Sequence, residues 1–270
     1  MCKFFTSIGI PCIYTNGETA DVPDLVRTIV INNTFSARIK KTDIIDASRI
    51  NAPALIVGFS STGKATWEDS ENSGIGSNGL TSGRHDLLSP NYKVHTETFS
   101  PEVPDELVYC GKYGLEDLLP GDDRFTISSA LLSPTRTYAP MLVDLFGVVG
   151  RENILGLIHC SGGGQTKIGK FGQPGIAYIK DELFPTPPLF NFLQEAQRAP
   201  WNDMYKTYNM GHRMEAIVTT KSMAQDCIAV SKSYGIDAKI IGRVVENKQN
   251  TTGRTVLIQS PHGEFRYEFT

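Results

Sequence analysis

The sequence predicts an α/β (α+β) protein in two domains: a partial N-terminal strand domain and a C-terminal α/β sandwich domain. Three observations favour this class. Apolar and β-branched runs of strand length recur along the chain, and segments with apolar residues at helical spacing lie between them in the second half. Residues 43–51 form a polar linker ahead of the first fully apolar run. The linker therefore predicts that a second domain opens with the strand at residues 54–59.

The N-terminal segment predicts strands. Residues 1–8 are typical of a helix end, residues 10–14 of a strand, and residues 25–41 of two strands joined at a turn. A chain that begins at a helix end predicts that upstream sequence is missing or that another chain supplies it. Residues 16–24 form a polar loop with carboxylates at Glu18, Asp21 and Asp24, which are ligands that hard cations prefer. On this pattern alone, an acidic turn in solvent is the first interpretation.

The C-terminal domain predicts alternating strands and helices. We expect strands at residues 54–59, 154–158, 214–218, 238–245, 255–259 and 265–269. We expect helices at residues 82–88, 140–146, 189–196 and 222–235, the last opened by a capping box at Ser222. Residues 60–83 and 204–211 are expected to be loops, and residues 90–121 an insertion over the surface in the form of a hairpin or lid.

A glycine turn follows the strand at 154–158. His159, Cys160 and Ser161 lead into three glycines at 162–164, so the backbone can bend tightly and lie close to a ligand. Successive N–H groups in such a bend can bind an anion. Taken alone, the motif is more typical of a structural turn with a core histidine, which is the favoured local interpretation. A dyad of Cys160 and His159 is disfavoured, because adjacent strand residues point to opposite faces.

Several separated loops share the character of that turn. Glycine, hydroxyl and amide groups gather at residues 16–18, 76–79, 134–136, 162–164 and 209–211. This distribution favours a phosphate-rich ligand held by backbone and hydroxyl donors. Some of these loops have structural interpretations that stay open: an N-cap turn at 76–79, and a helix cap with a surface arginine at 134–136.

Composition excludes several classes of protein. The net charge is −3, from 26 basic and 29 acidic residues, which argues against a nucleic-acid footprint. No stretch approaches the ~20 apolar residues of a membrane span. The five cysteines are isolated, so neither a disulfide framework nor a structural zinc site is indicated, and a cytoplasmic location is expected. The P-loop and the Gly-x-Gly-x-x-Gly motif are absent.

Six motifs in order give a specific resemblance. They are Gly17-Glu18-Thr19-Ala20-Asp21-Val22-Pro23, Asp43-Ile44-Ile45-Asp46, Ser77-Asn78-Gly79, the run from Leu132 to Tyr138, His159-Cys160-Ser161-Gly162-Gly163-Gly164 and the run from Met204 to Gly211. In this order they resemble the aminoimidazole ribonucleotide synthetase (phosphoribosylformylglycinamidine cyclo-ligase) family, across nearly the whole chain. The chain looks like a divergent member that lacks most of the N-terminal domain. The resemblance implies that residues 1–46 are the remnant of that domain and that residues 47–270 form the C-terminal domain.

The resemblance implies a two-domain synthetase-like fold and a homodimer formed through the N-terminal domain. It implies an ATP- and Mg²⁺-dependent ligase of purine biosynthesis, which closes the ring of formylglycinamidine ribonucleotide to aminoimidazole ribonucleotide. His159 would lie at the reacting centre, and Gly17, Glu18 and Thr19 would bind the nucleotide, with Glu18 also a metal ligand. The implied substrate-binding residues are Ser77, Asn78, Gly79, Thr135, Arg136, Gly162, Gly163, Gly164, Asn209 and Gly211.

The chain also departs from the family pattern. The family's Asp-Gly-Val-Gly-Thr-Lys segment is absent, Gly76 stands where the biosynthetic enzyme has histidine, and residues 90–121 are inserted. Whether the chain is an enzyme by itself is therefore open at this level. The alternatives are another ATP-using enzyme of the same superfamily, such as selenophosphate synthetase or thiamin phosphate kinase, and a non-catalytic ligand-binding relative.

Overall fold

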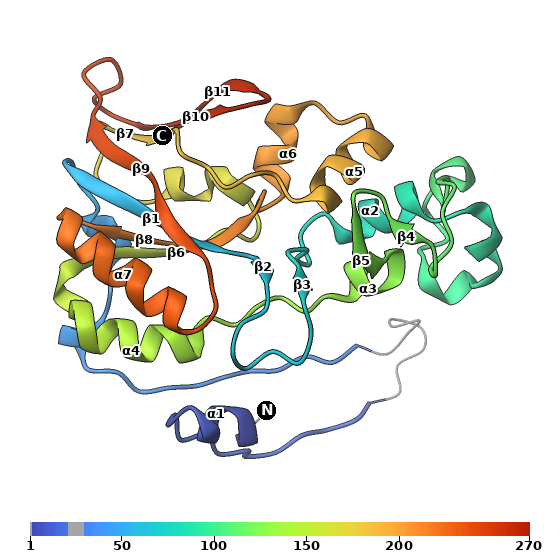
Figure 1. The fold of residues 1–270 in the computed structure, drawn as a ribbon, viewed down its shortest axis with the longest axis horizontal. Helices are drawn as coiled ribbons and strands as arrows, with labels where there is room; N and C mark the ends of the chain where they lie inside the picture. The colour runs from blue at the N-terminus through green and yellow to red at the C-terminus, as the bar shows by residue number, and fades with distance from the viewer. Residues whose placement is uncertain (1, 21–29) are drawn as a thin grey trace.

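The computed structural model describes residues 2–20 and 30–270, and it is a mixed α/β fold built on a seven-stranded sheet (Figure 1). The sheet order is β11-β10-β7-β9-β1-β8-β6, in which β10 and β7 are parallel and all other neighbours are antiparallel. Its strands are β1 (Ala54–Ser60), β6 (Ile154–His159), β7 (Ile176–Lys180), β8 (His212–Val218), β9 (Ala238–Glu246), β10 (Arg254–Ser260) and β11 (Gly263–Phe269). The predicted fold class is confirmed.

Helices cover both faces of the sheet (Figure 1). On one face, α4 (Ala139–Val149) and α7 (Lys221–Ser233) pack with Val57 and Ala216 into one core. On the other, α5 (Pro188–Gln197) and α6 (Trp201–Thr207) form a second core with Ile56 and Ile217. Neighbouring residues of β1 and β8 thus point into different cores, as the two-residue period of a strand requires.

A smaller lobe flanks the sheet. It contains α2 (Leu80–Leu87), α3 (Ile127–Leu132) and the two-stranded pairs β2 (Thr62–Gly63) with β3 (Asn72–Ser73) and β4 (Leu118–Leu119) with β5 (Asp122–Thr126). The segment expected to be an insertion forms the 3₁₀ turns η3 (Pro90–Val94), η4 (Thr96–Thr98) and η5 (Asp105–Leu107) before β4. Val108 and Tyr109 in this segment are buried in the same core as Leu87 of α2 and Leu119 of β4. The segment therefore packs as part of the lobe.

The N-terminal segment differs from the prediction. A short helix, α1 (Cys2–Ser7), is present, but residues 10–14 and 30–41 contain no strand, and residues 25–29 lie outside the described residues. Ile13 and Ile31 are 85% and 82% exposed. β-branched residues favour strands only where a neighbouring strand accepts their hydrogen bonds, and the described part of this segment has no such neighbour.

Three further expectations were wrong. Residues 60–83, expected to be a loop, contain β2, β3 and the start of α2. Residues 204–211 are not all loop, because α6 continues to Thr207. The N-cap of α7 is Thr220, whose Oγ1 accepts a hydrogen bond from the Met223 N–H (3.2 Å), and not Ser222. Strand β7 was not predicted at all. The other predicted strands and helices of the C-terminal domain are confirmed within a few residues.

The edge of the sheet at β6 is covered by the linker. The 3₁₀ turn η2 (Ala47–Arg49) lies against β6, and Arg49 Nη2 donates a hydrogen bond to the Ile154 carbonyl (3.3 Å). Ile50 is fully buried, and a Cβ on Gly156 would lie 2.6 Å from its Cδ1. Gly156 is therefore required for this close approach. No helix in the described part of the chain is both long and apolar enough to span a bilayer.

Candidate functional site

The glycine turn after β6 is a tight bend. Ser161 N–H donates to the His159 carbonyl (2.8 Å), and Gly164 N–H donates to the Ser161 carbonyl (2.7 Å). Gly163 and Gly164 have positive φ angles of +101° and +48°. A Cβ on Gly164 would lie 2.5 Å from the Tyr205 carbonyl oxygen, so the backbone here packs directly against α6. Only glycine fits this conformation and this contact.

A cavity of about 50 Å³ lies beside His159. Five predicted site residues line it, namely Ser77, Asn78, Thr135, His159 and Asn209. Residues that were not predicted complete the lining: Gly76, Cys160, Ser161, Thr207, Tyr208 and Arg213. Four of the six sequence motifs therefore meet at one place, although up to 132 positions separate Ser77 from Asn209 in the chain.

His159 is a neutral imidazole in this setting. Burial, together with the nearby cations Arg213 and Lys167, lowers the pKa of His159 to about 4. At neutral pH the ring therefore has one nitrogen that can accept a proton or a hydrogen bond. Lys167 Nζ lies 3.2 Å from Ser161 Oγ, at the edge of the same turn.

Arg213 is the most unusual residue of the cavity. Its side chain is 2% exposed, and Nη2 donates to the carbonyls of Gly74 (2.8 Å) and Ile75. Nη1 is buried and has no hydrogen-bond partner. Arg213 Nη2, Cζ and Nε lie 3.4–3.6 Å from where a Cβ on Gly76 would be, which is ordinary van der Waals contact, so the guanidinium packs directly beside Gly76.

A buried ionic network lies behind the cavity. Lys180 Nζ is 2.5 Å from Glu215 Oε1, and both side chains are fully buried. Glu215 Oε1 also lies 2.9 Å from His212 Nε2. Burial alone would raise the pKa of the Glu215 carboxyl, but Lys180 and His212 together lower it to about 2. Lys180 also donates to the Gln165 carbonyl (2.6 Å), which ties the network to the residue after the glycine turn.

Cys160 faces this network and not His159. Its thiol lies close to His212 and Glu215, and burial raises its pKa well above the ordinary value. The thiol therefore stays protonated, as expected for a cysteine without a nucleophilic role. Cys160, His212 and Glu215 are the kinds of side chain that can hold a metal ion, but the Lys180 ammonium already neutralises Glu215 there. Mg²⁺ also prefers oxygen ligands, so this cluster does not fit it.

Two predicted substrate-binding side chains make their hydrogen bonds to other groups of the protein. Arg136 donates to both oxygens of Glu68 (2.8 and 2.7 Å) and to the carbonyls of Ser60, Thr62 and Gly63, which accounts for all five guanidinium donors. The Asn209 amide bonds Ser61, Gly211 and Gly74. These contacts hold the loop after β1 in place and leave no Arg136 donor for a ligand.

Three of the predicted glycines lie in three different places. Gly162 lies near the cavity without lining it, since a Cβ on it would be 3.9 Å from Oδ1 of the lining residue Asn78. Gly79 packs instead under Tyr208, whose Cε1 would be 2.5 Å from an added Cβ. Gly211 lines a different, larger cavity of about 260 Å³.

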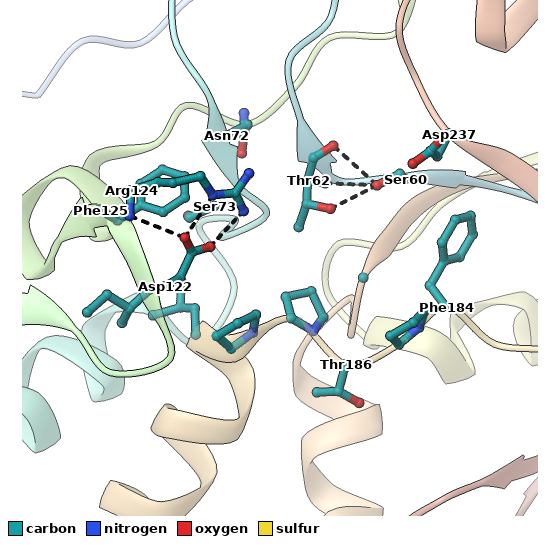
Figure 2. A pocket seen from close by; sticks show the side chains of 16 residues that line it. Ser60, Thr62, Asn72, Ser73, Asp122, Arg124, Phe125, Phe184, Thr186 and Asp237 are labelled. Carbon is teal, nitrogen blue, oxygen red and sulfur yellow. Dashed lines mark hydrogen bonds and ion pairs between the residues drawn. The ribbon is translucent and has the colours of Figure 1, made fainter.

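The larger cavity lies between the small lobe and the proline segment before α5 (Figure 2). Two pairs of its polar side chains bond each other: Arg124 Nε and Nη2 donate to Asp122 (2.8 Å each), and Ser60 Oγ lies 3.1 Å from Thr62 Oγ1. Gly211 is its one lining residue from the predicted set, so the smaller cavity beside His159 is the candidate site.

The predicted nucleotide-binding residues lie elsewhere. Gly17, Glu18 and Thr19 are exposed and do not line the cavity beside His159. Among the described residues, Glu18 is not part of a cluster of metal-ligating side chains. Two carboxylates of the same loop, Asp21 and Asp24, lie outside the described residues. Thus the described residues offer Mg²⁺ no set of oxygen ligands.

Comparison with known proteins gives one family of curated relatives. The chain is 30% identical over 231 residues to the phosphoribosylformylglycinamidine cyclo-ligase of Methanococcus vannielii, an alignment that covers 86% of this chain and 55% of that protein. It is 31% identical over 245 residues to the protein of the same name from Methanocaldococcus jannaschii, covering 89% of this chain and 60% of that one. The chain therefore spans little more than half the length of these relatives. No protein-family model matches it.

Solved structures are more distant. PurL of Thermotoga maritima complexed with FGAR aligns with 85% of this chain and 29% of its own, at 14% identity and a TM-score of 0.40. The hydrogenase maturation protein HypE aligns with 83% of this chain and 55% of its own, at 13% identity and a TM-score of 0.41.

Proposed function

We propose that this chain belongs to the phosphoribosylformylglycinamidine cyclo-ligase family, whose members it resembles at 30–31% identity, and that it takes part in purine biosynthesis as a ligase, alone or as part of a longer chain. The proposed reaction is the ATP-dependent closure of formylglycinamidine ribonucleotide to aminoimidazole ribonucleotide. The observation that carries the proposal is the meeting of Ser77, Asn78, Thr135, His159 and Asn209, from four separated motifs, at one cavity.

The chemistry of the cavity suits this reaction. In the proposed sequence, the phosphoryl group of ATP is transferred to the formamide oxygen, and ADP leaves. An amidine nitrogen then attacks the same carbon, the C–O bond breaks, and phosphate is released. The attacking nitrogen loses a proton as the ring forms, and neutral His159 accepts it. The imidazole of His159 is therefore the general base. The glycine turn lets the backbone approach the reacting group closely.

ATP and Mg²⁺ belong to the proposal through the sequence resemblance. Mg²⁺ would neutralise phosphate charge during the transfer. Glu18 is the proposed metal ligand, and Gly17 and Thr19 are the proposed nucleotide-binding residues beside it. Among the described residues, Glu18 has no cluster of companion metal ligands.

We also propose the domain division at residue 46 and a homodimer formed through the N-terminal segment. Residues 1–46 contribute no strand to the main sheet in their described part. Apolar side chains on this segment are more than half exposed, among them Ile13, Tyr14, Val30, Ile31 and Phe35. Such a surface is favourable to cover, which supports a second chain or further sequence packing there.

The test is product formation. The chain, and a second preparation carrying any in-frame upstream sequence of its gene, would be incubated with ATP, Mg²⁺ and formylglycinamidine ribonucleotide, and aminoimidazole ribonucleotide would be measured by diazotisation alongside phosphate release. We expect His159→Asn to lower kcat by about 10²–10⁴-fold. His95→Asn, at a histidine that is 58% exposed, is the matched control and should leave kcat unchanged.

No product from either preparation would refute the proposed reaction. In that case, turnover of ATP with another acceptor would favour a different ATP-using enzyme of the superfamily. Nucleotide binding without turnover of any acceptor would favour a non-catalytic ligand-binding relative.

A further inference from the structure

The starting observation is a buried positive charge without a counterion. Arg213 is 2% exposed and, within the described part of the chain, forms no ion pair. The two carboxylates nearby are engaged by other cations: the partly buried Glu68 by Arg136 at 2.7 Å, and the fully buried Glu215 by Lys180 at 2.5 Å. A guanidinium does not lose its proton in a protein, so burying it without an anion is costly.

The second observation is where the unused donor lies. Nη2 of Arg213 is held by two backbone carbonyls, while Nη1 has no partner, and the residue lines the cavity beside His159. No carboxylate lines that cavity. Lys167 does not line the cavity itself, but its ammonium donates a hydrogen bond to Oγ of the lining residue Ser161 and has two further N–H groups, so it brings a second positive charge close to the cavity.

We propose that Arg213 and Lys167 form an anion subsite next to His159 that binds a phosphoryl group. Arg213 Nη1 donates to one phosphate oxygen, and Lys167 supplies a second contact as a point charge. The bound anion supplies the counterion that the buried guanidinium lacks. Neither residue belongs to the set that the sequence motifs implied for substrate or nucleotide.

The size and polarity of the cavity define the ligand class. Its volume of about 50 Å³ exceeds the roughly 10–15 Å³ that one water molecule needs, and it suits a group the size of phosphate, but not a whole nucleotide. Hydroxyl and amide side chains of Ser77, Asn78 and Ser161 surround the two cations, as in sites for hydrated oxyanions. The shared chemistry is a phosphate dianion, either the 5′-phosphate of a ribonucleotide or the phosphate released in ring closure.

This inference deepens the proposed function, and rests on it only for the source of the phosphate. Its test is an equilibrium measurement that needs no turnover. The whole chain would be titrated with inorganic phosphate and, separately, with ribose 5-phosphate at constant ionic strength, with the His159 ring followed by NMR. We expect saturable binding with a shift of the His159 signals toward the protonated form, because an anion beside the ring offsets the two cations.

The variants locate the binding. Arg213→Met should weaken phosphate binding at least about tenfold, and Arg213→Lys by less, because it keeps the charge but loses the planar fork. Lys167→Met should weaken it several-fold. Lys170→Met, at an exposed lysine three residues further on, is the matched control and should leave the affinity within about twofold.

Tighter binding of ribose 5-phosphate would assign the subsite to the substrate's 5′-phosphate, and tighter binding of inorganic phosphate to the transferred group. Unchanged affinity in Arg213→Lys and Lys167→Met, or no saturable binding of either probe to the wild-type chain, would overturn the inference. Arg213→Lys keeps a positive charge at the buried position, and Lys167 is only half-buried, so the test survives if Arg213→Met does not fold. A chain that binds phosphate through Arg213 but forms no imidazole product would refute the proposed reaction alone.

Discussion

The Lys180–Glu215 pair gives the sharpest prediction about stability. In Lys180→Met the ammonium 2.5 Å from Glu215 is removed, and the fully buried carboxylate keeps only His212 as a partner for Oε1. Removing one member of a buried pair typically costs about 3–5 kcal/mol. The pKa of Glu215 gives a second route to the same quantity: lowering it from 4.5 to about 2 corresponds to roughly 3 kcal/mol. We therefore expect a loss of about 4 kcal/mol.

Equilibrium urea unfolding at pH 7 measures this loss, and thermal unfolding should show a Tm lower by about 8–16 °C. The pH dependence has a definite sign. Because the folded-state pKa of Glu215 is depressed, the stabilisation is present above pH 4.5 and is lost as the pH falls toward 2. The difference between wild type and Lys180→Met should thus be smaller at pH 3 than at pH 7.

A double variant and a control variant test whether the loss comes from the unpaired buried charge. The double variant Lys180→Met/Glu215→Gln should be more stable than Lys180→Met alone, because the unpaired charge is gone. Lys206→Met removes an exposed pair with Asp203 (3.7 Å) and should change stability by less than about 0.5 kcal/mol. A Lys180→Met protein within about 1 kcal/mol of wild type, or a double variant whose loss equals the sum of both single losses, would refute the reasoning.

Other features give further expectations. An NMR titration of His159 should show a midpoint near pH 4; since this pKa is depressed, its stabilisation is present above pH 6.5 and falls by about 2 kcal/mol between pH 6.5 and 4, allowing for partial exposure. Arg136→Lys should cost about 2–3 kcal/mol in urea unfolding, because lysine cannot replace five directed donors; lost activity with unchanged stability would show a ligand contact instead. Gly164→Ala should destabilise by more than about 2 kcal/mol, whereas Gly147→Ala, in open space on α4, should stabilise by up to about 1 kcal/mol; thermal unfolding of both variants checks this contrast.

The elements that the sequence predicted are those whose local pattern agrees with their surroundings. β1 is an apolar run buried on both faces, and α5 shows apolar residues at helical spacing. β7 was missed because it is short and ends in Lys180, a residue type rarely buried; only the partner Glu215, 35 positions away, explains its burial. The N-terminal strands failed for the opposite reason, since their local pattern lacks a neighbouring strand.

The candidate site divides in the same way. The sequence motifs predicted residues that meet at the cavity because each motif has a recognisable local form. They did not distinguish side chains that face the cavity from those, such as Arg136, whose donors are consumed by the loop after β1. Arg213 was missed because nothing in a strand sequence marks an arginine as buried, and its unpaired donor exists only in the folded chain.

The linker over β6 has a consequence for how the protein behaves in concentrated solution. β6 is the last strand of its sheet, and residues 47–50 shield its outer side. An uncovered edge strand is a template on which another molecule can extend the sheet. A version trimmed to Ala54 would keep every strand of the sheet but lose Ile50 from the larger core, and we expect it to self-associate at concentrations where a version beginning at residue 47 stays dispersed. The few residues that cover β6 therefore keep the sheet from being extended by the strand of another molecule.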